Sequence, residues 1–232
     1  MPENKIDDQD ILNFALNLEY LEAEFYTYAT IGKSITSFGI GTKGRVSGSN
    51  PTTGGTTVGG KQVTFSDNES VTRDIATQIG ADERAHVVLL RGALGSAACA
   101  MPNIDLGALG FGFGDQNDFL RAARILEDIG VTAYSGAAGF LKTPDIITAA
   151  ACLLGAEAEH AATIRTQIAR LDSNDTFGRR GLDPSAQRTG KASPLHQGQR
   201  WADCDQDGWT GALPRVRREG RCKTRRLFPE RS

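Results

Sequence analysis

The chain has 232 residues, 39% of them hydrophobic, and its 26 basic and 28 acidic side chains leave a formal net charge of −2. This apolar content is enough for a buried core and argues against full disorder. No apolar run reaches the roughly 18–20 residues that a membrane span needs, so no membrane association is expected. The acidic N-terminal segment shows no apolar signal region, which favours a cytoplasmic location.

The near-zero net charge hides two different kinds of sequence. Residues 1–178 carry 13 basic and 22 acidic side chains, a net charge of −9, whereas residues 179–232 carry 13 and 6, a net charge of +7. We therefore expect one folded domain over residues 1–172 and an irregular basic tail over residues 173–232.

Four stretches of the first part have the apolar spacing of amphipathic helices. In chain order they cover about residues 8–29, 70–94, 116–141 and 144–171. Thr143 before Pro144 is typical of a helix start, with a capping residue followed by proline at the first helical position. The turn between the third and fourth helices is short, so these two helices should be antiparallel neighbours.

Two long connections separate these helices. Residues 31–66 are rich in Gly, Ser and Thr, contain β-like runs at 45–47 and 62–65, and predict a long surface loop or a hairpin. Residues 98–114 form a Gly-rich connection that could span roughly 55 Å when extended, enough to cross a bundle lengthwise. The expected fold is an all-α four-helix bundle with a long insertion between its first and second helices.

Two of the three histidines occur in Glu-x-x-His motifs, Glu83 to His86 and Glu157 to His160. The chain has 11 Glu, so by chance a given His has a Glu three positions before it about once in twenty cases. For two given His, both coincidences are expected together about once in four hundred cases. Residues i and i+3 share one face of a helix, so each motif points a carboxylate and an imidazole the same way. A single motif of this kind is usually an exposed helix pair, but two on separate helices indicate a site.

The helices also repeat in pairs. Glu19 and Tyr26 of the first helix recur as Glu127 and Tyr134 of the third, both at an offset of 108 residues, and the two Glu-x-x-His motifs are offset by 74. The offsets differ by 34 residues, close to the length of the Gly-rich insertion. The repeat therefore predicts that the bundle contains two copies of one helix pair, which is the arrangement that a symmetric two-metal centre requires.

Six residues form the predicted metal site: Glu19, Glu83, His86, Glu127, Glu157 and His160. Di-iron and di-manganese carboxylate bundles have this arrangement: two helices each contribute one Glu, and the other two helices each contribute a Glu-x-x-His motif. Four buried carboxylates would be prohibitive without partners, and two divalent cations balance their charge. Oxygen-rich ligation with one imidazole per metal suits iron, or alternatively manganese, better than structural zinc.

Further polar residues lie near this face. Glu22 is predicted as an extra ligand or a nearby acid, whereas Glu24 and Glu159 are expected to be solvated. Tyr26 and Tyr134 follow their glutamates by two turns on the same face. Three roles remain open for these phenols: a hydrogen bond to a ligand carboxylate, a redox-active group in catalysis, or ordinary core packing.

The helices resemble those of one known family. The run 10–26 is similar to the opening helix of the ferritin-like family that includes plant and bacterial desiccation-related proteins. Residues 81–86, 126–134 and 156–160 resemble its second, third and fourth helices. The resemblance extends over about residues 8–172.

This resemblance implies a site and an activity. By analogy with ferritin-like di-iron proteins, Glu19 and His86 would be terminal ligands of one metal, Glu127 and His160 of the other, and the two remaining glutamates would bridge. The implied chemistry is oxidation of Fe(II) by oxygen or peroxide in stress or desiccation tolerance. The alternatives are a non-catalytic protective or structural bundle and an oxidase of an organic substrate. The expected partners are metal ions and oxygen or peroxide, and homo-oligomerisation is left open.

The basic tail has three interpretations: an arm that binds nucleic acid, a disordered segment, or a product of a frameshift. Residues 225–231, read one nucleotide later, can encode Gly-Gly-Phe-Phe-Pro-Asn, which resembles the end of desiccation-related proteins. We therefore favour a frameshift near Gly178, and nucleic-acid binding is not expected. The gene sequence tests this hypothesis, because an early stop codon in the shifted frame would refute it.

Overall fold

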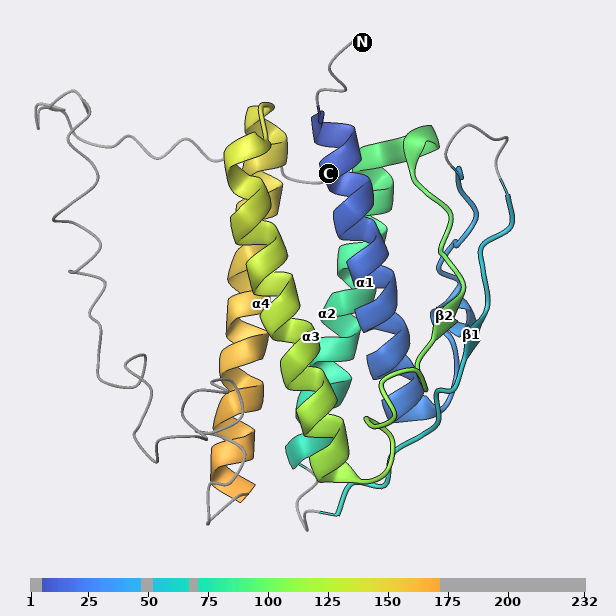
Figure 1. Cartoon of the computed structure of the whole chain (residues 1–232), viewed down its shortest axis with the longest axis vertical. Coiled ribbons are helices and arrows are strands. Elements are labelled where there is room, and N and C mark those ends of the chain that lie inside the picture. Colours follow the sequence, from blue (N-terminus) through green and yellow to red (C-terminus); the bar gives the residue numbers. More distant parts are fainter. Residues whose placement is uncertain (1–5, 47–51, 67–70, 172–232) are drawn as a thin grey trace, which may run out of the picture. The chain divides into compact units, whose positions relative to one another are not determined.

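The computed structural model describes residues 6–46, 52–66 and 71–171. Its long helices are α1 (Asp8–Ile31), α2 (Val71–Leu94), α3 (Gln116–Ala137) and α4 (Pro144–Leu171) (Figure 1). Three short 3-10 helices and two short strands complete it: η1 (Ile35–Phe38), η2 (Gly95–Ala97), η3 (Ala138–Phe140), β1 (Thr57–Val58) and β2 (Ile104–Asp105). The predicted all-α four-helix bundle is confirmed, and the predictions for the basic tail lie outside the described residues.

Local signals explain where the helices begin and end. Asp7 caps α1 by accepting from the backbone N–H of Asp10 at 2.9 Å, and Asp10 accepts from the N–H of Asp7 at 3.1 Å. Gly32, with a φ of 67°, ends α1 two residues later than expected. The third helix ends as an α-helix at Ala137, four residues earlier than predicted, because the chain tightens there into η3.

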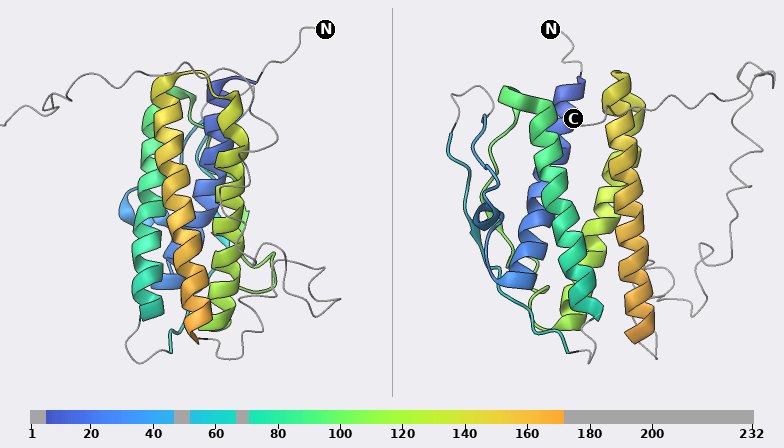
Figure 2. Two further views of the ribbon diagram at one scale, coloured as in Figure 1. Left: turned by 90° about the vertical axis from the view of Figure 1, so that its left-hand side faces the viewer. Right: turned by 180° about the vertical axis from the view of Figure 1, so that it is seen from behind.

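The helices pack as two pairs, α1 against α2 and α3 against α4, and the right-hand view in Figure 2 shows the two pairs side by side. All four helices contribute wholly or almost wholly buried side chains, among them Leu16, Leu90, Phe119 and Ile164. Burial of each such side chain stabilises the fold by roughly 1.5–3 kcal/mol. None of the described helices is both long and apolar enough to cross a membrane.

The two long connections pair with each other along the outer side of α1 (Figure 1). β1, in the insertion, and β2, between α2 and α3, form a parallel pair in which Thr57 lies opposite Ile104. The β-like runs predicted at 45–47 and 62–65 are not strands within the described residues, although Arg45 forms a single bridge with Cys99. The pairing joins segments far apart in the sequence, which local composition cannot reveal.

Candidate metal centre

Each helix places one part of the predicted site in the centre of the bundle. Glu19 lies on α1 and Glu127 on α3, while the two Glu-x-x-His motifs lie on α2 and α4. The four glutamates are wholly buried, and His86 and His160 are 8% and 6% exposed. Helical spacing of three residues turns both members of each motif inward.

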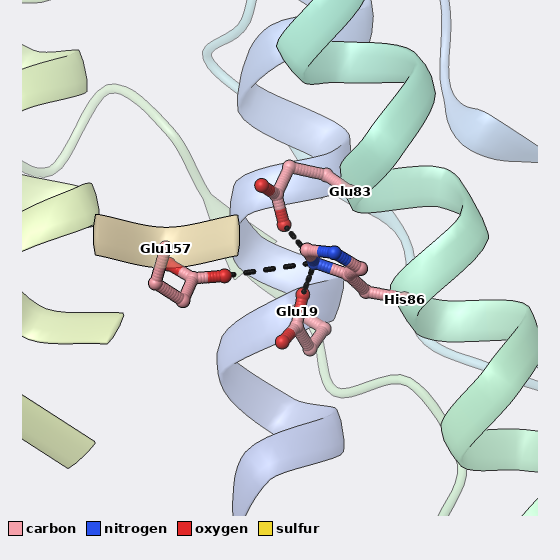
Figure 3. Close-up of side chains that lie close together, drawn as sticks. All are labelled: Glu19, Glu83, His86 and Glu157. Atoms are coloured by element: carbon pink, nitrogen blue, oxygen red, sulfur yellow. Dashed lines mark hydrogen bonds and ion pairs between the residues drawn. The ribbon is translucent and has the colours of Figure 1, made fainter. Parts of the chain in front are cut away.

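The six side chains form two overlapping quartets in which the ligand atoms lie within 4.8 Å of one another. The first contains Glu19, Glu83, His86 and Glu157, drawn in Figure 3, and the second contains Glu83, Glu127, Glu157 and His160. Glu83 and Glu157 belong to both quartets. The structure therefore brings all six predicted residues together, with the shared glutamates between the two halves.

The first quartet converges on the imidazole of His86 (Figure 3). Its Nδ1 lies 3.1 Å from Glu19 Oε2, 3.1 Å from Glu83 Oε2 and 3.5 Å from Glu157 Oε1. These side chains come from α1, α2 and α4, so they meet only when the bundle has assembled.

The second quartet repeats this arrangement around His160. Its Nδ1 lies 2.9 Å from Glu83 Oε1 and 3.3 Å from Glu127 Oε2. The two oxygens of Glu83 thus face two different imidazoles, whose ring centres are 5.9 Å apart. A carboxylate in this position can bridge two cations.

Two buried phenols complete the centre, and each crosses between the helix pairs. Tyr26 of α1 donates a hydrogen bond of 2.5 Å to Oε1 of Glu127 on α3. Tyr134 of α3 donates to Oε1 of Glu19 on α1. In each glutamate the phenol occupies one oxygen and leaves Oε2 facing the histidine of the quartet.

Burial changes the protonation of the carboxylates. It raises the pKa of Glu19 to about 8 and that of Glu157 to about 10, and it also raises the pKa of Glu127. Removal from water penalises the ionised form of each group, and the neighbouring carboxylates add repulsion. Without a cation, burial and mutual repulsion therefore both favour the protonated form of these three acids.

Burial alone would lower the pKa of both imidazoles, but the neighbouring carboxylates outweigh it and raise the pKa to about 10 for His86 and about 11 for His160. Glu83 shows the opposite balance. Its burial would raise the pKa, yet its contacts with the two imidazoles bring it down to about 2. Glu83 is the carboxylate that two positive groups hold in its ionised form.

The donor set fits a pair of divalent cations. Five buried ligand atoms have no hydrogen-bond partner: Glu83 Oε1, Glu127 Oε2, both carboxylate oxygens of Glu157, and His160 Nδ1. Although His160 Nδ1 and Glu83 Oε1 are close, neither makes an aligned hydrogen bond. Buried polar atoms are seldom left in this state, and two cations would satisfy them and balance four negative charges.

A cleft between α2 and α4 gives access to the two histidines. It has a volume of about 620 Å³, and His86, His160, Asp82 and Glu159 lie along its wall. Asp82 Oδ2 is 3.4 Å from His160 Nε2, on the side of the ring away from the quartet. A carboxylate in that place orients an imidazole ligand. The sequence contained no signal for Asp82, because its contact lies on another helix.

Three further glutamates lie next to the site, and their burial agrees with the predictions to different degrees. Glu159 is exposed, as expected, but Glu24 is wholly buried rather than solvated. The inserted loop covers that side of α1, and Ser34 Oγ donates to Glu24 Oε1 at 2.7 Å. Glu22, predicted as an extra ligand or a nearby acid, is buried beside the centre but belongs to neither quartet.

Comparison with known proteins supports the fold. The family model described as a ferritin-like domain matches residues 7–170, which is more than two thirds of the chain and includes all six residues of the centre. A search of curated proteins and a search of solved structures each gave no significant match to this chain.

Proposed function

Because the chain belongs to the ferritin-like domain family, we propose that it holds two iron ions, or alternatively manganese ions, between its four helices and oxidises Fe(II) with oxygen or peroxide. The observation that carries this proposal is the pair of quartets that share two buried glutamates. Shared carboxylates between two histidines are what a bridged two-metal site requires.

The residues divide into two terminal pairs and one shared pair. Glu19 with His86 would hold one ion, and Glu127 with His160 would hold the other. Glu83 and Glu157 would bind both. Oxygen-rich ligands with one imidazole per ion favour iron and manganese over the thiolate-rich sites typical of structural zinc.

When bound, iron supplies one-electron chemistry: two Fe(II) substrate ions lose one electron each, and peroxide with two protons takes up both electrons to yield two water molecules. The phenols of Tyr26 and Tyr134 hold Oε1 of the two terminal glutamates, so that Oε2 remains directed at the site. The cleft along His86 and His160 gives small molecules and water a route to the imidazoles.

The biological setting follows from the resemblance to desiccation-related proteins. Removal of Fe(II) together with peroxide would limit oxidative damage during drying and other stress. Two rival functions differ in what they predict: a protective bundle without turnover consumes no oxidant, and an oxidase of an organic substrate consumes oxidant only when that substrate is present.

Metal content and Fe(II) oxidation of the full-length protein test the proposal. Anaerobic titration with Fe(II) should reach about two ions per chain, and added oxygen or peroxide should then be consumed. The double variant Glu83→Ala/Glu157→Ala should lose most of the bound metal, because both shared carboxylates are removed. Asp145→Ala, which removes an exposed carboxylate from α4, is the matched control and should bind as the unmodified protein does.

The possible outcomes separate the candidate functions. Fewer than about two ions per chain, or full occupancy in the double variant, contradicts the two-metal centre. Two bound ions without Fe(II)-dependent consumption of oxygen or peroxide contradict Fe(II) oxidation and leave the structural bundle and the oxidase of an organic substrate.

A further inference from the structure

A small apolar pocket lies between α1, α3 and α4, beside the phenol that contacts Glu19. It extends from Phe14, which is 56% exposed, to the buried Tyr134. Of the described side chains that line it, only Tyr134 carries a polar group, and that hydroxyl donates to Glu19. The pocket shares no lining residue with the cleft between α2 and α4, so it approaches the centre by a different way.

The repeat of the helix pairs shows why the space is open. The offset of 108 residues pairs three positions of the pocket with three positions of the other half: Tyr134 with Tyr26, Ala133 with Phe25, and Ile11 with Phe119. In that other half, the rings of Phe25 and Phe119 stack with their centres 5.4 Å apart, and Tyr26 lies edge-on to Phe119 at 5.7 Å. Ala133 and Ile11 supply no rings, so the place that two phenylalanines fill beside Tyr26 is left empty beside Tyr134.

The size and lining of the pocket restrict what can occupy it. Its volume is about 10 Å³, on the order of one water-sized sphere, which excludes an organic substrate. A water molecule in such a site needs about 2–4 polar partners, and the hydroxyl of Tyr134 is already engaged with Glu19. Peroxide is disfavoured for the same reason, because its hydroxyl groups would lose their hydrogen bonds. A small apolar molecule loses none, and dioxygen is the apolar reactant of the proposed function.

Resting on the proposed oxidation of Fe(II), we propose that this pocket is the site at which dioxygen binds before it reaches the centre. In the reaction two Fe(II) ions lose one electron each, and dioxygen with two protons takes up both electrons to yield hydrogen peroxide. The ring of Tyr134 lines the pocket while its hydroxyl contacts Glu19, so one side chain separates the bound oxygen from the first quartet. Oxygen uses this apolar pocket, whereas ions and peroxide use the polar cleft along His86 and His160.

Dissolved oxygen itself is the probe for binding, applied to the full-length protein without metal. Oxygen is paramagnetic, so it speeds the NMR relaxation of the methyl groups beside which it resides. Under oxygen pressure, the methyl groups of Ala15 and Ala137 in the pocket should relax faster than that of Ala151, which is exposed on α4 outside the pocket. Ala133→Phe supplies the ring that the other half has at the corresponding position, and it should abolish this excess relaxation.

Oxidation rates with two oxidants test what the pocket does. In Ala133→Phe, oxidation of Fe(II) by oxygen should slow by about tenfold, whereas oxidation by hydrogen peroxide and the amount of bound Fe(II) should not change. Ala151→Phe makes the same change at an exposed position of α4 and is the matched control, with normal rates for both oxidants. Ile11→Phe adds a ring from α1 and should reproduce the effect, which covers the case in which Ala133→Phe does not fold.

The outcomes separate the oxygen site from the proposed function. An unmodified protein that shows the excess relaxation but oxidises no Fe(II) refutes the proposed function and supports the oxygen site alone. Without excess relaxation in the pocket, the oxygen site is wrong even if Fe(II) is oxidised. Equal slowing with oxygen and peroxide in Ala133→Phe would also overturn the proposal, because it would reflect a disturbed contact between Tyr134 and Glu19. Unchanged oxidation by oxygen in that variant would mean that oxygen enters elsewhere.

Discussion

Gly130 shows how closely the backbone approaches the centre at the scale of a single residue. It lies on α3, where a Cβ atom would come within 2.1 Å of Oε2 and 2.8 Å of Cδ of Glu157. The absence of a side chain at this position is what lets the shared carboxylate lie between the two histidines. A glycine in the middle of a helix normally weakens it, and at this position the close approach of Glu157 leaves no space for a side chain.

We predict that Gly130→Ala displaces Glu157 and lowers metal affinity by at least tenfold, because one shared ligand must move. Gly136→Ala is the control on the same helix, since a Cβ atom there would meet nothing within 4 Å. This control should bind metal normally and gain roughly 0.5–1 kcal/mol of stability. Calorimetric metal titration and urea unfolding of both variants provide the measurements. Unchanged metal affinity in Gly130→Ala would show that metal binding does not depend on the observed position of the Glu157 carboxylate.

The phenols also show a limit of reasoning from single residues. Each tyrosine follows the glutamate of its own helix by seven residues, a rise of about 10 Å, which is too far for a direct hydrogen bond. In the structure each phenol instead bonds to the glutamate of the other helix, Tyr26 to Glu127 and Tyr134 to Glu19. Both bonds follow from one antiparallel alignment of α1 and α3.

At the scale of whole elements, the paired connections form a cover over α1. Gly44 of the insertion bridges Thr52, and its neighbour Arg45 bridges Cys99 of the connection between α2 and α3. A Cβ atom at Gly44 would lie 2.4 Å from the carbonyl oxygen of Ala98 and from the carbonyl carbon of Cys99. Backbone atoms cannot move aside as the end of a side chain can, so this close approach requires glycine.

Gly44→Ala should therefore destabilise the protein by about 1–3 kcal/mol, the usual cost of overpacking. Metal binding should be retained, because the centre lies within the helices. In Gly41→Ala the nearest atom to the new Cβ would be the guanidinium Nη2 of Arg91 at 3.6 Å, an ordinary contact, and little change is expected. Urea unfolding and metal content distinguish the two variants. Equal stability of both would mean that the pairing of the connections contributes nothing to the fold.

At the scale of the whole molecule, the centre makes stability depend on pH. In the metal-free protein, His86, His160 and Glu157 have a pKa of about 10 or 11 when folded, well above the values of 6.5 and 4.5 for exposed groups. The folded state therefore holds more protons than the unfolded state between about pH 5 and 9. Glu83, with its lowered pKa, acts in the opposite direction only below about pH 4.5.

We expect the free energy of unfolding of the metal-free protein to fall as pH rises from 5 to 9, by about 1.4 kcal/mol per pH unit for each extra proton held. Metal binding displaces those protons, so the additional stability conferred by Mn²⁺ should increase over the same range. Urea unfolding with a chelator or with excess Mn²⁺, repeated at several pH values, measures both trends. A metal-free protein that becomes more stable with rising pH would contradict this charge balance.

Much of the fold could be predicted because its signals are local. The apolar spacing located the four helices to within a few residues, and the capping residues explain their ends. The two Glu-x-x-His motifs and the repeat of Glu19 as Glu127 selected the six residues that the structure brings together. Helical geometry alone sets which side chains share a face, so this information is present in any stretch of the sequence. Their role as metal ligands remains a prediction.

Other features depend on how the helix faces and the connections meet, and these were decided only by the tertiary structure. The burial of Glu24 under the inserted loop, the contact of Asp82 with His160, and the pairing of β1 with β2 all join segments that are distant in the sequence. Such contacts are set by the packing of whole elements against each other rather than by local spacing. The sequence by itself thus determined a helical bundle with six candidate ligands, while assembly decided which carboxylate each phenol holds and which acids lie in the core.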